Sequence, residues 1–331
     1  MGIKDLLKEL PGGNAKTSTR YGFADLAILR GFPASADTGT LLFVCAFRHK
    51  DAFVAGDYIP AAREFQRQII SMNLLYKWEY TLVFDGVPPT EKRHEHRRRQ
   101  SKQGSLTMTA EFISICILIC KRHFVKFVVA PAEADMQVGR TADGGIPVCR
   151  DSDDIAFGNY TVVIVDSWPK EQYRLVDLRT PLAEGMKDTL PVYHYFHLYG
   201  WKVIHWFAAV MGCDVSVDSS GIDGMGRVAF IRALRDSEDE GVRELEPRKF
   251  AKKLWDLCRP SCRLKYTIAS ISAELRRVER WYAVDGTYYD STANLYSVSG
   301  SLVANATLAR RRHMTGETNP KTGAEYSAAA R

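Results

Sequence analysis

Three aspartates lie within four positions in the segment VCRDSDDIAFG, residues 148–158, directly after an apolar run. Adjacent carboxylates repel one another, and at the mouth of a hydrophobic core they reduce stability unless a positive charge lies among them. A bound metal ion is the simplest source of that charge. The segment therefore predicts a metal site, provided that other parts of the chain supply further acidic ligands.

Two more apolar segments end in acidic residues. The segment TLVFDG, residues 81–86, contains Asp85, and FVKFVVAPAEAD, residues 124–135, ends with Glu133 and Asp135. Helical patterns separate or follow these strand-like segments, over residues 61–78, 107–123, 134–140 and 201–212. The alternation predicts an α/β fold with a parallel sheet that helices cover on both faces. Because functional groups gather at the carboxyl ends of parallel strands, we expect these acids to converge at one edge.

Two acidic residues and a glycine-rich turn lie outside this strand pattern. Asp37 follows a weaker strand candidate that Pro33 interrupts, so periodicity alone does not include it. Asp214 follows the apolar helix 201–212, and beyond it the sequence GIDGMGRVAFIRAL leads into an amphipathic helix. This spacing of glycines is typical of a helix-hairpin-helix turn, where backbone N–H groups approach a phosphate. A plain glycine-capped helix start is the alternative.

The composition limits the class of protein. The chain has 331 residues, of which 46% are hydrophobic and 25% charged, as in a protein with one large core or two modest ones. No apolar run approaches the ~18 residues of a membrane span, and the N-terminus lacks a signal-peptide pattern, so we expect an intracellular protein without a membrane partner. Seven cysteines without a CxxC pair predict reduced thiols, although the CxxxC pairs Cys116/Cys120 and Cys258/Cys262 leave a zinc site as an alternative.

Positive charge is concentrated in one short segment. The net charge is +6, and six Lys and Arg residues fall between residues 92 and 102. A nucleic acid is one partner for such a local field, and a solvated helix face is the alternative.

Taken together, these motifs resemble the structure-specific 5′ nuclease family, which includes flap endonuclease, exonuclease 1 and the xeroderma pigmentosum G nuclease. The matching strings are MGIKDLL, VFDGVPPTEKR, APAEADMQ, DSDDIAFG and GCD with the glycine turn, in that order over residues 1–235. The resemblance implies a PIN-like fold. We expect a nuclease domain at 1–295, comprising an N-terminal region at 1–105, an internal nuclease region at 120–235 with the helix-hairpin-helix turn at 214–235, and helices at 236–295 that pack back; a flexible basic tail follows at 296–331.

The resemblance also implies a two-metal site. Mg²⁺ prefers oxygen ligands and keeps several waters, so carboxylates suit it better than His or Cys. Two such ions, with Mn²⁺ as a substitute, would activate a water and neutralise the leaving oxygen during attack on a phosphodiester. The seven carboxylates that match the family's metal ligands are Asp37, Asp85, Glu133, Asp135, Asp151, Asp153 and Asp214.

Further residues match groups that contact DNA in the family. Lys92 and Arg99 match a basic pair that would stabilise charge at the scissile phosphate. Phe43 matches an aromatic residue that stacks on a base, with a core role as the alternative. The residues that match the turn gripping the duplex backbone, which in the family also hosts K⁺, are Gly221, Gly224, Gly226 and Arg227.

The chain departs from the family pattern at several points. Arg150 precedes the DSD string and Asp154 follows it, and we expect Asp154 to face solvent or to pair with a base such as Arg150. Ala229 comes one position early in the helix after the glycine turn, which leaves the hairpin geometry open. The segment between the second and third acids is short, so we expect a reduced arch over residues 87–110. No motif for binding a sliding clamp is visible, and we expect a monomer.

The main hypothesis is a metal-dependent nuclease that cuts branched DNA at 5′ flaps or 5′ ends, in DNA replication or repair in the nucleus. One alternative is a catalytically inactive relative that serves as a nucleic-acid-binding or scaffold protein. Another is a PIN-type ribonuclease. Because all seven acidic positions are filled, the sequence favours an active enzyme, and the glycine turn together with the basic pair favours DNA as its substrate.

Overall fold

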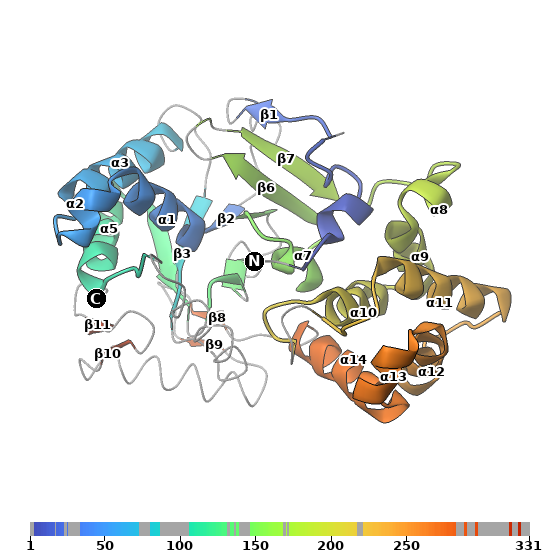
Figure 1. Ribbon diagram of the computed structural model, residues 1–331. Coiled ribbons are helices and arrows are strands. Elements are labelled where there is room, and N and C mark those ends of the chain that lie inside the picture. The colour runs from blue at the N-terminus through green and yellow to red at the C-terminus, as the bar shows by residue number, and fades with distance from the viewer. Residues whose placement is uncertain are drawn as a thin grey trace. The chain divides into compact units, whose positions relative to one another are not determined.

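The computed structural model describes most of the chain up to residue 282. The described residues are 3–16, 18–22, 25, 34–72, 80–86, 106–130, 133–135, 137–138, 146–167, 170, 172–216 and 221–282, with four two-residue strands beyond them. They form two compact units (Figure 1). The sheet unit comprises Arg20–Arg150, Val162–Arg174 and Asp285–Arg331, and the helical unit comprises Met1–Thr19, Asp151–Thr161 and Leu175–Val284.

A seven-stranded sheet has the order β1-β7-β6-β5-β2-β3-β4. The neighbouring pairs β6–β5, β5–β2, β2–β3 and β3–β4 are parallel, and β1 pairs with β7 in the antiparallel sense. The predicted α/β class with a mostly parallel sheet is therefore confirmed, with an antiparallel edge. The strands are β1 (Tyr21–Gly22), β2 (Ala34–Asp37), β3 (Tyr80–Phe84), β4 (Lys126–Val129), β5 (Ile146–Cys149), β6 (Thr161–Ser167) and β7 (Gln172–Asp177).

Strand β2, the weak candidate of the sequence, lies near the middle of the sheet. Ala36 is in register with Leu82 of β3 on one side and with Val148 of β5 on the other. Ala34, Ser35 and Ala36 are all buried. Small side chains have low strand propensity, but a strand that is paired on both sides and buried on both faces is stabilised by its neighbours.

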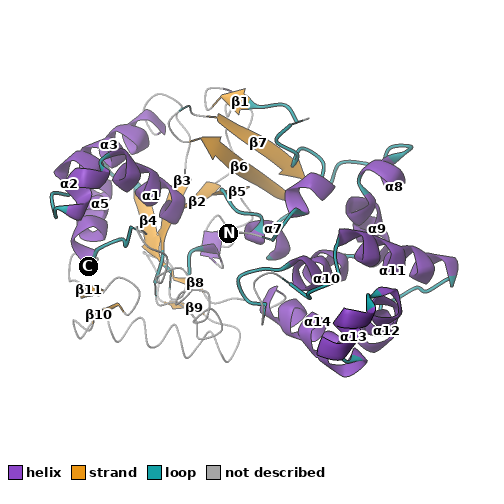
Figure 2. Cartoon of the chain, in the orientation of Figure 1, coloured by secondary structure: helices purple, strands orange, loops and turns teal. Residues whose placement is uncertain are grey.

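Four helices pack together beside β3 and β4 in the sheet unit (Figure 2). They are α1 (Thr38–Arg48), α2 (Lys50–Val54), α3 (Ile59–Ile70) and α5 (Ala110–Arg122). Helix α5 agrees with the prediction for 107–123 and begins at Thr109, whose hydroxyl accepts a hydrogen bond of 3.3 Å from the Phe112 amide. Helix α3 agrees with the first part of the predicted helix 61–78, and the last part of that prediction, residues 73–78, lies outside the described residues.

The cysteines are reduced thiols, as predicted. All seven are free and buried. Burial raises the pKa of the Cys45 and Cys120 thiols to about 12, so both remain protonated at neutral pH. Within the described ranges, no three His, Cys, Asp or Glu side chains form a group that could hold a metal ion, and this holds for the cysteine pairs and for the predicted carboxylate ligands alike.

Glu64 on α3 supplies a first testable prediction. Its carboxylate accepts hydrogen bonds of 2.9 and 3.1 Å from Arg67 and one of 3.0 Å from Gln68, and it also pairs with Arg48. The hydrogen bonds from Arg67 are the main cause that lowers the pKa of Glu64 from 4.5 to about 2, against the opposing effect of burial. A carboxyl group with a lowered folded-state pKa stabilises the protein above its unfolded pKa and loses this effect as the pH falls through the folded value.

We therefore expect Glu64→Gln to lower the free energy of unfolding by about 1 kcal/mol at pH 7, less than the full pKa shift because water screens the arginine charges. The difference from wild type should shrink between pH 4.5 and pH 2. Urea unfolding at several pH values measures it. Glu184→Gln, at an exposed carboxylate, is the control and should show no comparable pH-dependent loss.

The helical unit is built around a buried helix, α10. Trp206 of α10 is fully buried, and its ring lies 5.1 Å from that of Phe250 on α12. Helix α11 continues to Asp239 and buries Ser237, whose hydroxyl donates to the Ala233 carbonyl at 2.8 Å. The elements are η1 (Leu6–Glu9), α7 (Asp153–Ala156), α8 (Met186–Thr189), α9 (Pro191–Tyr199), α10 (Trp201–Met211), α11 (Arg227–Asp239), α12 (Pro247–Leu257), α13 (Pro260–Lys265) and α14 (Ile268–Tyr282).

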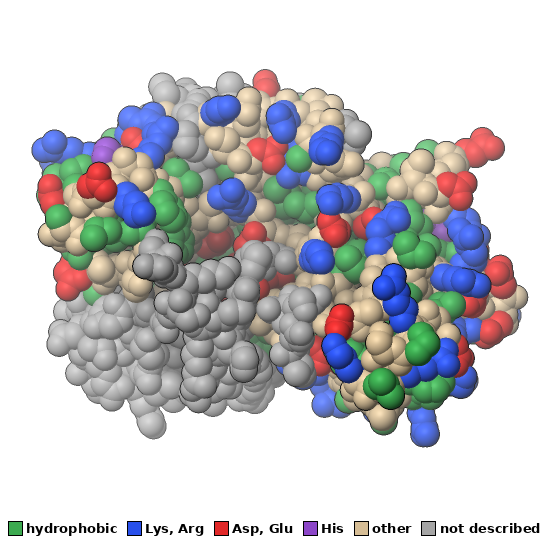
Figure 3. Space-filling model, in the orientation of Figure 1, with side chains coloured by type: hydrophobic (Ala, Val, Ile, Leu, Met, Phe, Trp, Pro, Cys, Tyr) green, Lys and Arg blue, Asp and Glu red, His purple; other side chains and the backbone are tan. Residues whose placement is uncertain are grey.

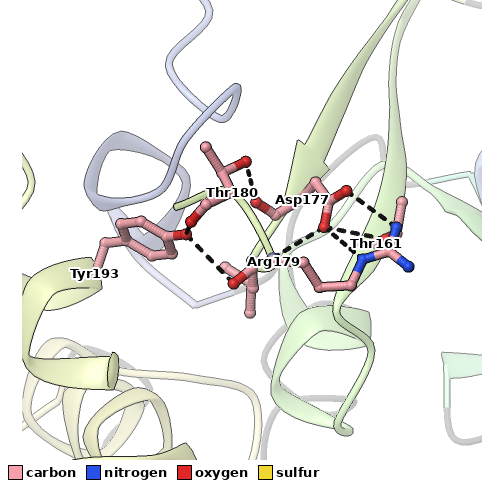
Figure 4. A network of polar contacts seen from close by, with 6 residues as sticks. Thr161, Asp177, Arg179, Thr180 and Tyr193 are labelled. Atoms are coloured by element: carbon pink, nitrogen blue, oxygen red, sulfur yellow. Dashed lines mark hydrogen bonds and ion pairs between the residues drawn. The ribbon is translucent and has the colours of Figure 1, made fainter. Parts of the chain in front are cut away.

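A network of hydrogen bonds holds the segment between β7 and α9 in place (Figure 4). The Asp177 carboxylate accepts hydrogen bonds from Arg179 at 3.0 Å and from the Thr161 hydroxyl at 3.2 Å. The buried Tyr193 hydroxyl donates to the carbonyls of Leu178, at 3.3 Å, and Thr180. The network fixes the turn that leads from the sheet into the helices.

Some expectations fall outside the described residues. Most of the predicted arch, residues 87–105, does so, and of the predicted tail the structure describes Tyr296 and the antiparallel pair β10 (Thr318–Asn319) and β11 (Ala324–Glu325). Strands β8 (Tyr288–Tyr289) and β9 (Leu295–Tyr296) form a second such pair. Among the described helices, none combines the length and apolar character that crossing a membrane requires.

Candidate functional site

Two of the predicted metal ligands lie side by side at the carboxyl ends of neighbouring strands. Asp37 ends β2 and Asp85 directly follows β3, because these parallel strands pair in register from Ala34 with Tyr80 to Asp37 with Val83. Asp37 is also the N-cap of α1, where its Oδ1 accepts a hydrogen bond of 2.8 Å from the Gly39 amide. The convergence expected for the second acid therefore extends to Asp37, which periodicity alone had not included.

Gly39 leaves space between these two carboxylates. A Cβ atom built on Gly39 would lie 3.2 Å from Asp37 Oδ1 and 3.7 Å from Asp85 Oδ2. Both carboxylates therefore border the small volume that a side chain at this position would occupy. An open space lined by carboxylate oxygens has the chemistry of a site for a hard divalent ion.

The third acidic segment joins this pair through the backbone. The Ala134 amide donates a hydrogen bond of 2.9 Å to Asp85 Oδ1, which places the segment after β4 against the end of β3. Glu133, one residue earlier, is buried, and Asp135 begins a short helical turn in which the Ala134 carbonyl accepts from the Val138 amide at 2.9 Å. Acidic residues thus lie at or after the ends of three strands of the sheet unit, and the hydrogen bond from Ala134 to Asp85 connects two of these strand ends.

The DSD segment lies in the helical unit. Asp151 is partly exposed, whereas Asp153 is buried and opens α7. Between them, the Ser152 hydroxyl donates to the Ile3 carbonyl at 3.1 Å, which ties the segment to the N-terminal residues. Asp153 Oδ1 accepts a hydrogen bond of 2.9 Å from the hydroxyl of Tyr282.

The expectation that Asp154 faces solvent is wrong. Its side chain is fully buried, while Arg150 is exposed. The reason is that α7 begins at Asp153 and is short, so both residues of its first turn are enclosed by the helical unit. The Asp154 carbonyl accepts a hydrogen bond of 2.7 Å from the Asn159 side chain, which further fixes this turn.

Asp214 follows the end of α10 in a tight loop. Gly212 is the C-cap, and its carbonyl accepts from the Lys4 amide at 3.3 Å. The Ser216 hydroxyl lies 3.2 Å from both the amide and the thiol of Cys213. Burial, followed by the charge of Asp153, raises the pKa of the Cys213 thiol, so it remains protonated.

The seven predicted metal ligands are thus divided between the two units. Asp37, Asp85, Glu133 and Asp135 belong to the sheet unit, and Asp151, Asp153 and Asp214 to the helical unit. All seven are oxygen donors, which fits Mg²⁺ or Mn²⁺ rather than zinc.

The glycine turn connects α10 to α11. The Ile222 amide donates to the Val210 carbonyl of α10 at 3.1 Å, and the Asp223 amide donates to the Tyr266 hydroxyl at 3.2 Å. Gly221 has φ +86°, and a Cβ there would lie 2.3 Å from the Val210 carbonyl oxygen. The turn therefore requires glycine at this position, as the helix-hairpin-helix interpretation predicts.

The other glycines of the turn have different surroundings. A Cβ at Gly224 would meet Cys262 of α13 at 3.1 Å, whereas a Cβ at Gly226 would meet nothing within 4 Å. Gly226 is the N-cap of α11 and lacks a side chain that could cap the first amides of that helix. These amides are the groups that the phosphate-binding interpretation uses.

Arg227, the first residue of α11, pairs with a residue that the sequence did not single out. Its guanidinium group contacts both carboxylate oxygens of the buried Glu9, with one distance of 3.2 Å. An arginine at a helix start opposes the helix dipole, and a carboxylate beside it offsets this effect. The pair ties η1 to α11, and a contact of Arg227 with DNA stays a prediction.

Phe43 is on α1 and 39% of its surface is exposed, next to Phe47 at a ring distance of 6.4 Å. Its exposure is compatible with stacking on a base and unlike that of a core residue. Lys92 and Arg99 lie outside the described residues. On the face in Figure 3, Lys and Arg side chains are interspersed with acidic ones over α11–α14, so they do not form one continuous basic patch.

Tyr282 is a residue of this region that no sequence motif singles out. It is buried at the end of α14, 129 positions from its partner Asp153. Burial, and then the charge of Asp153, raise the pKa of Tyr282 well above its usual value, so the hydroxyl keeps its proton and donates. An aromatic pair at a helix end, Trp281 and Tyr282, is the only signal in the sequence, and it indicates packing alone.

Comparison with known proteins finds solved structures with a similar fold. No protein-family model and no curated protein matches the sequence. The catalytic core of Rad2 in complex with a DNA substrate is 18% identical, with 85% of this chain and 81% of that chain covered and a TM-score of 0.55. Human GEN1 in complex with Holliday junction DNA is 15% identical, with 90% and 68% covered and a TM-score of 0.54. GEN1, the Holliday junction-resolving enzyme, in complex with product DNA, Mg²⁺ and Mn²⁺ is 18% identical, with 94% and 68% covered and a TM-score of 0.51. The chain therefore has the fold of these enzymes.

Proposed function

We propose that this chain, which has the fold of the Rad2 and GEN1 catalytic cores, is a metal-dependent, structure-specific 5′ nuclease acting on branched or 5′-ended DNA inside the cell, most directly in the nucleus. The observation that carries the proposal is the pair Asp37 and Asp85, whose carboxylates border one open space at the ends of parallel strands. The fold of DNA-processing enzymes and the carboxylate pair support the same activity. GEN1 in complex with product DNA, Mg²⁺ and Mn²⁺ supports a divalent cofactor.

The seven carboxylates named above would hold two Mg²⁺ ions, or Mn²⁺ in their place. When bound there, such ions activate a water and stabilise the leaving oxygen of a phosphodiester. The chain itself orients the ligands: the Gly39 amide fixes Asp37, the Ala134 amide fixes Asp85, and the Tyr282 hydroxyl fixes Asp153. Hydrogen bonds from two backbone amides and one phenol hydroxyl restrict the orientation of these carboxylates, as partners of metal-binding residues commonly do.

The remaining predicted groups would bind and orient the DNA. The glycine turn and the start of α11 would contact backbone phosphates, which positions a duplex without reading its sequence, and K⁺ at the turn would add to this contact. Phe43 would stack on a base near the cleaved bond. Lys92 and Arg99 would stabilise the charge that develops on the phosphate.

Cleavage of a labelled 5′-flap duplex in Mg²⁺ tests the proposal. We expect product from the wild type, none in EDTA, and a loss of about a thousandfold or more for Asp151→Asn with flap binding retained. Asp188→Asn, at an exposed carboxylate on α8, is the control and should cut like the wild type. The position of the label separates cleavage at the flap from stepwise removal of 5′ nucleotides.

Two outcomes would favour the alternatives. Flap binding by the wild type without any product, in Mg²⁺ and in Mn²⁺, would support the inactive nucleic-acid-binding protein. Faster cleavage of an RNA strand than of the same DNA strand would support the PIN-type ribonuclease. The Asp37 and Asp85 pair argues against the first alternative, because a binding protein without metal gains nothing from two adjacent carboxylates.

A further inference from the structure

Tyr282 connects the C-terminal helix of the helical unit to two of the acidic segments. Its hydroxyl donates a hydrogen bond of 2.9 Å to Asp153 Oδ1 and lies near the thiol of Cys213. Asp153 opens α7, and Cys213 directly precedes Asp214. One phenol group thus lies beside both segments that carry predicted metal ligands of this unit.

The ring of Tyr282 is held as firmly as its hydroxyl. It stacks on His205 of α10 at 5.7 Å with an interplanar angle of 20°, and it meets the ring of Phe157 edge-on at 5.0 Å. The His205 ring in turn hydrogen-bonds with the Ala156 carbonyl, at the end of α7, with Nε2 2.9 Å from the oxygen. The first residue of α7, Asp153, therefore contacts Tyr282, and its last residue, Ala156, contacts His205, the ring that stacks on Tyr282.

For a carboxylate that binds a metal ion, this arrangement affects the orientation of the ligand as well as its packing. A hydrogen bond from a fixed phenol restricts the orientation of a buried carboxylate, and groups of this kind orient metal ligands in proteins. The Ser216 hydroxyl, 3.2 Å from the amide and the thiol of Cys213, fixes the second loop in the same way. The two loops then have little freedom relative to each other.

We propose that Tyr282 is a positioning residue, whose hydroxyl sets the Asp153 carboxylate and the Cys213–Asp214 loop for binding a divalent ion. This inference depends on the proposed function for its purpose, and it gives the C-terminal helix α14 a part in the metal site. The sequence assigned α14 no role beyond packing back on the core. Loss of the hydroxyl alone should therefore weaken divalent-ion binding without unfolding the protein.

The test compares Tyr282→Phe with the wild type in the full chain, using Mn²⁺ and the electron paramagnetic resonance signal of the free ion. We expect the half-saturating Mn²⁺ concentration to rise about tenfold to a hundredfold, as for loss of other groups that orient metal ligands. The thermal midpoint in EDTA should stay close to that of the wild type, because phenylalanine keeps both ring contacts. In cleavage assays, kcat at fixed Mg²⁺ should fall while KM for the flap duplex is unchanged.

Tyr193→Phe is the matched control. It removes a buried hydroxyl of the same unit that donates to the backbone carbonyls of Leu178 and Thr180. A loss of Mn²⁺ binding equal to that of Tyr282→Phe would assign the effect to general loosening of the unit and overturn the proposal. Unchanged Mn²⁺ binding in Tyr282→Phe would overturn it as well.

A second variant shows whether Tyr282 acts through Asp153. In the background of Asp153→Asn, the further change Tyr282→Phe should shift Mn²⁺ binding by much less than tenfold, since the carboxylate it positions is already gone. Additive losses would overturn the proposal. Because Mn²⁺ binding is measured without DNA, a wild type that binds Mn²⁺ but cuts no flap would contradict the proposed function and leave the role of Tyr282 to be decided by the binding data.

Discussion

Asparagine in place of Asp37 is expected to reduce the rate of flap cleavage by about a thousandfold or more, while the protein folds as before. Asparagine caps a helix as well as aspartate does, and its Oδ1 can accept the same hydrogen bond from the Gly39 amide. The variant loses one of the two negative charges that border the space beside Gly39. Single-turnover cleavage in Mg²⁺ and urea unfolding in EDTA measure the two effects separately.

The stability measurement makes this prediction specific. Without metal, Asp37→Asn should unfold at nearly the same urea concentration as the wild type, because asparagine keeps the hydrogen bond from the Gly39 amide. Added Mg²⁺ should stabilise the wild type more than the variant, because a ligand stabilises the state that binds it. Asp57→Asn is the control: its exposed carboxylate also accepts a backbone amide, from Ile59 at the start of α3, and the variant should cut like the wild type. Full activity of Asp37→Asn would remove Asp37 from the metal site.

The parts of the fold that the sequence predicts well are those whose pattern is local. Strands β3, β4 and β5 are short apolar runs that end in polar residues, and the structure places them within a few residues of the prediction. Helices α5, α10, α12 and α14 follow from apolar residues at helical spacing. In each case a side-chain pattern and the burial it causes point to the same element.

The elements that the sequence predicts poorly depend on their neighbours. Strand β2 is made of Ala, Ser, Ala and Asp, and only pairing with β3 and β5 on its two sides explains it. Strand β6, with the apolar run TVVIVDS, has a clear local pattern, and its omission from the prediction is a failure to use that pattern rather than a limit of the sequence. The register that brings Asp37 beside Asp85 follows from the sheet and is invisible in either segment alone.

The candidate site shows the same division. The acidic residues are recognisable because each follows a strand or an apolar helix, and the resemblance to a nuclease family orders them. The groups that orient those acids cannot be recognised in the sequence. Gly39, the Ala134 amide and Tyr282 belong to no motif, and their contacts with the acids form only in the folded chain. Asp154 shows a different limit. The three aspartates of the segment DSDD look alike in the sequence, and the start of α7 decides which of them are buried.

The glycines of the turn between α10 and α11 separate architecture from DNA contact. Gly221→Ala is expected to lower the free energy of unfolding by about 3 kcal/mol or more, because its Cβ would lie 2.3 Å from the Val210 carbonyl oxygen and its φ of +86° is strained for alanine. Gly226→Ala should cost about 1 kcal/mol or less, since the backbone there is extended and a Cβ meets nothing within 4 Å. Urea unfolding measures both.

DNA binding should rank the two variants differently. At Gly226 a methyl group would stand at the start of α11, where the first amides would approach a phosphate, so Gly226→Ala should weaken duplex binding although it hardly affects stability. Fluorescence anisotropy with a labelled duplex measures the affinity, in buffer without denaturant and at a temperature at which both variants are folded. Wild-type affinity in Gly226→Ala would indicate that the glycine at this position serves the helix start alone. Equal losses of stability in the two variants would contradict the hairpin geometry itself, because only Gly221 is enclosed by the end of α10.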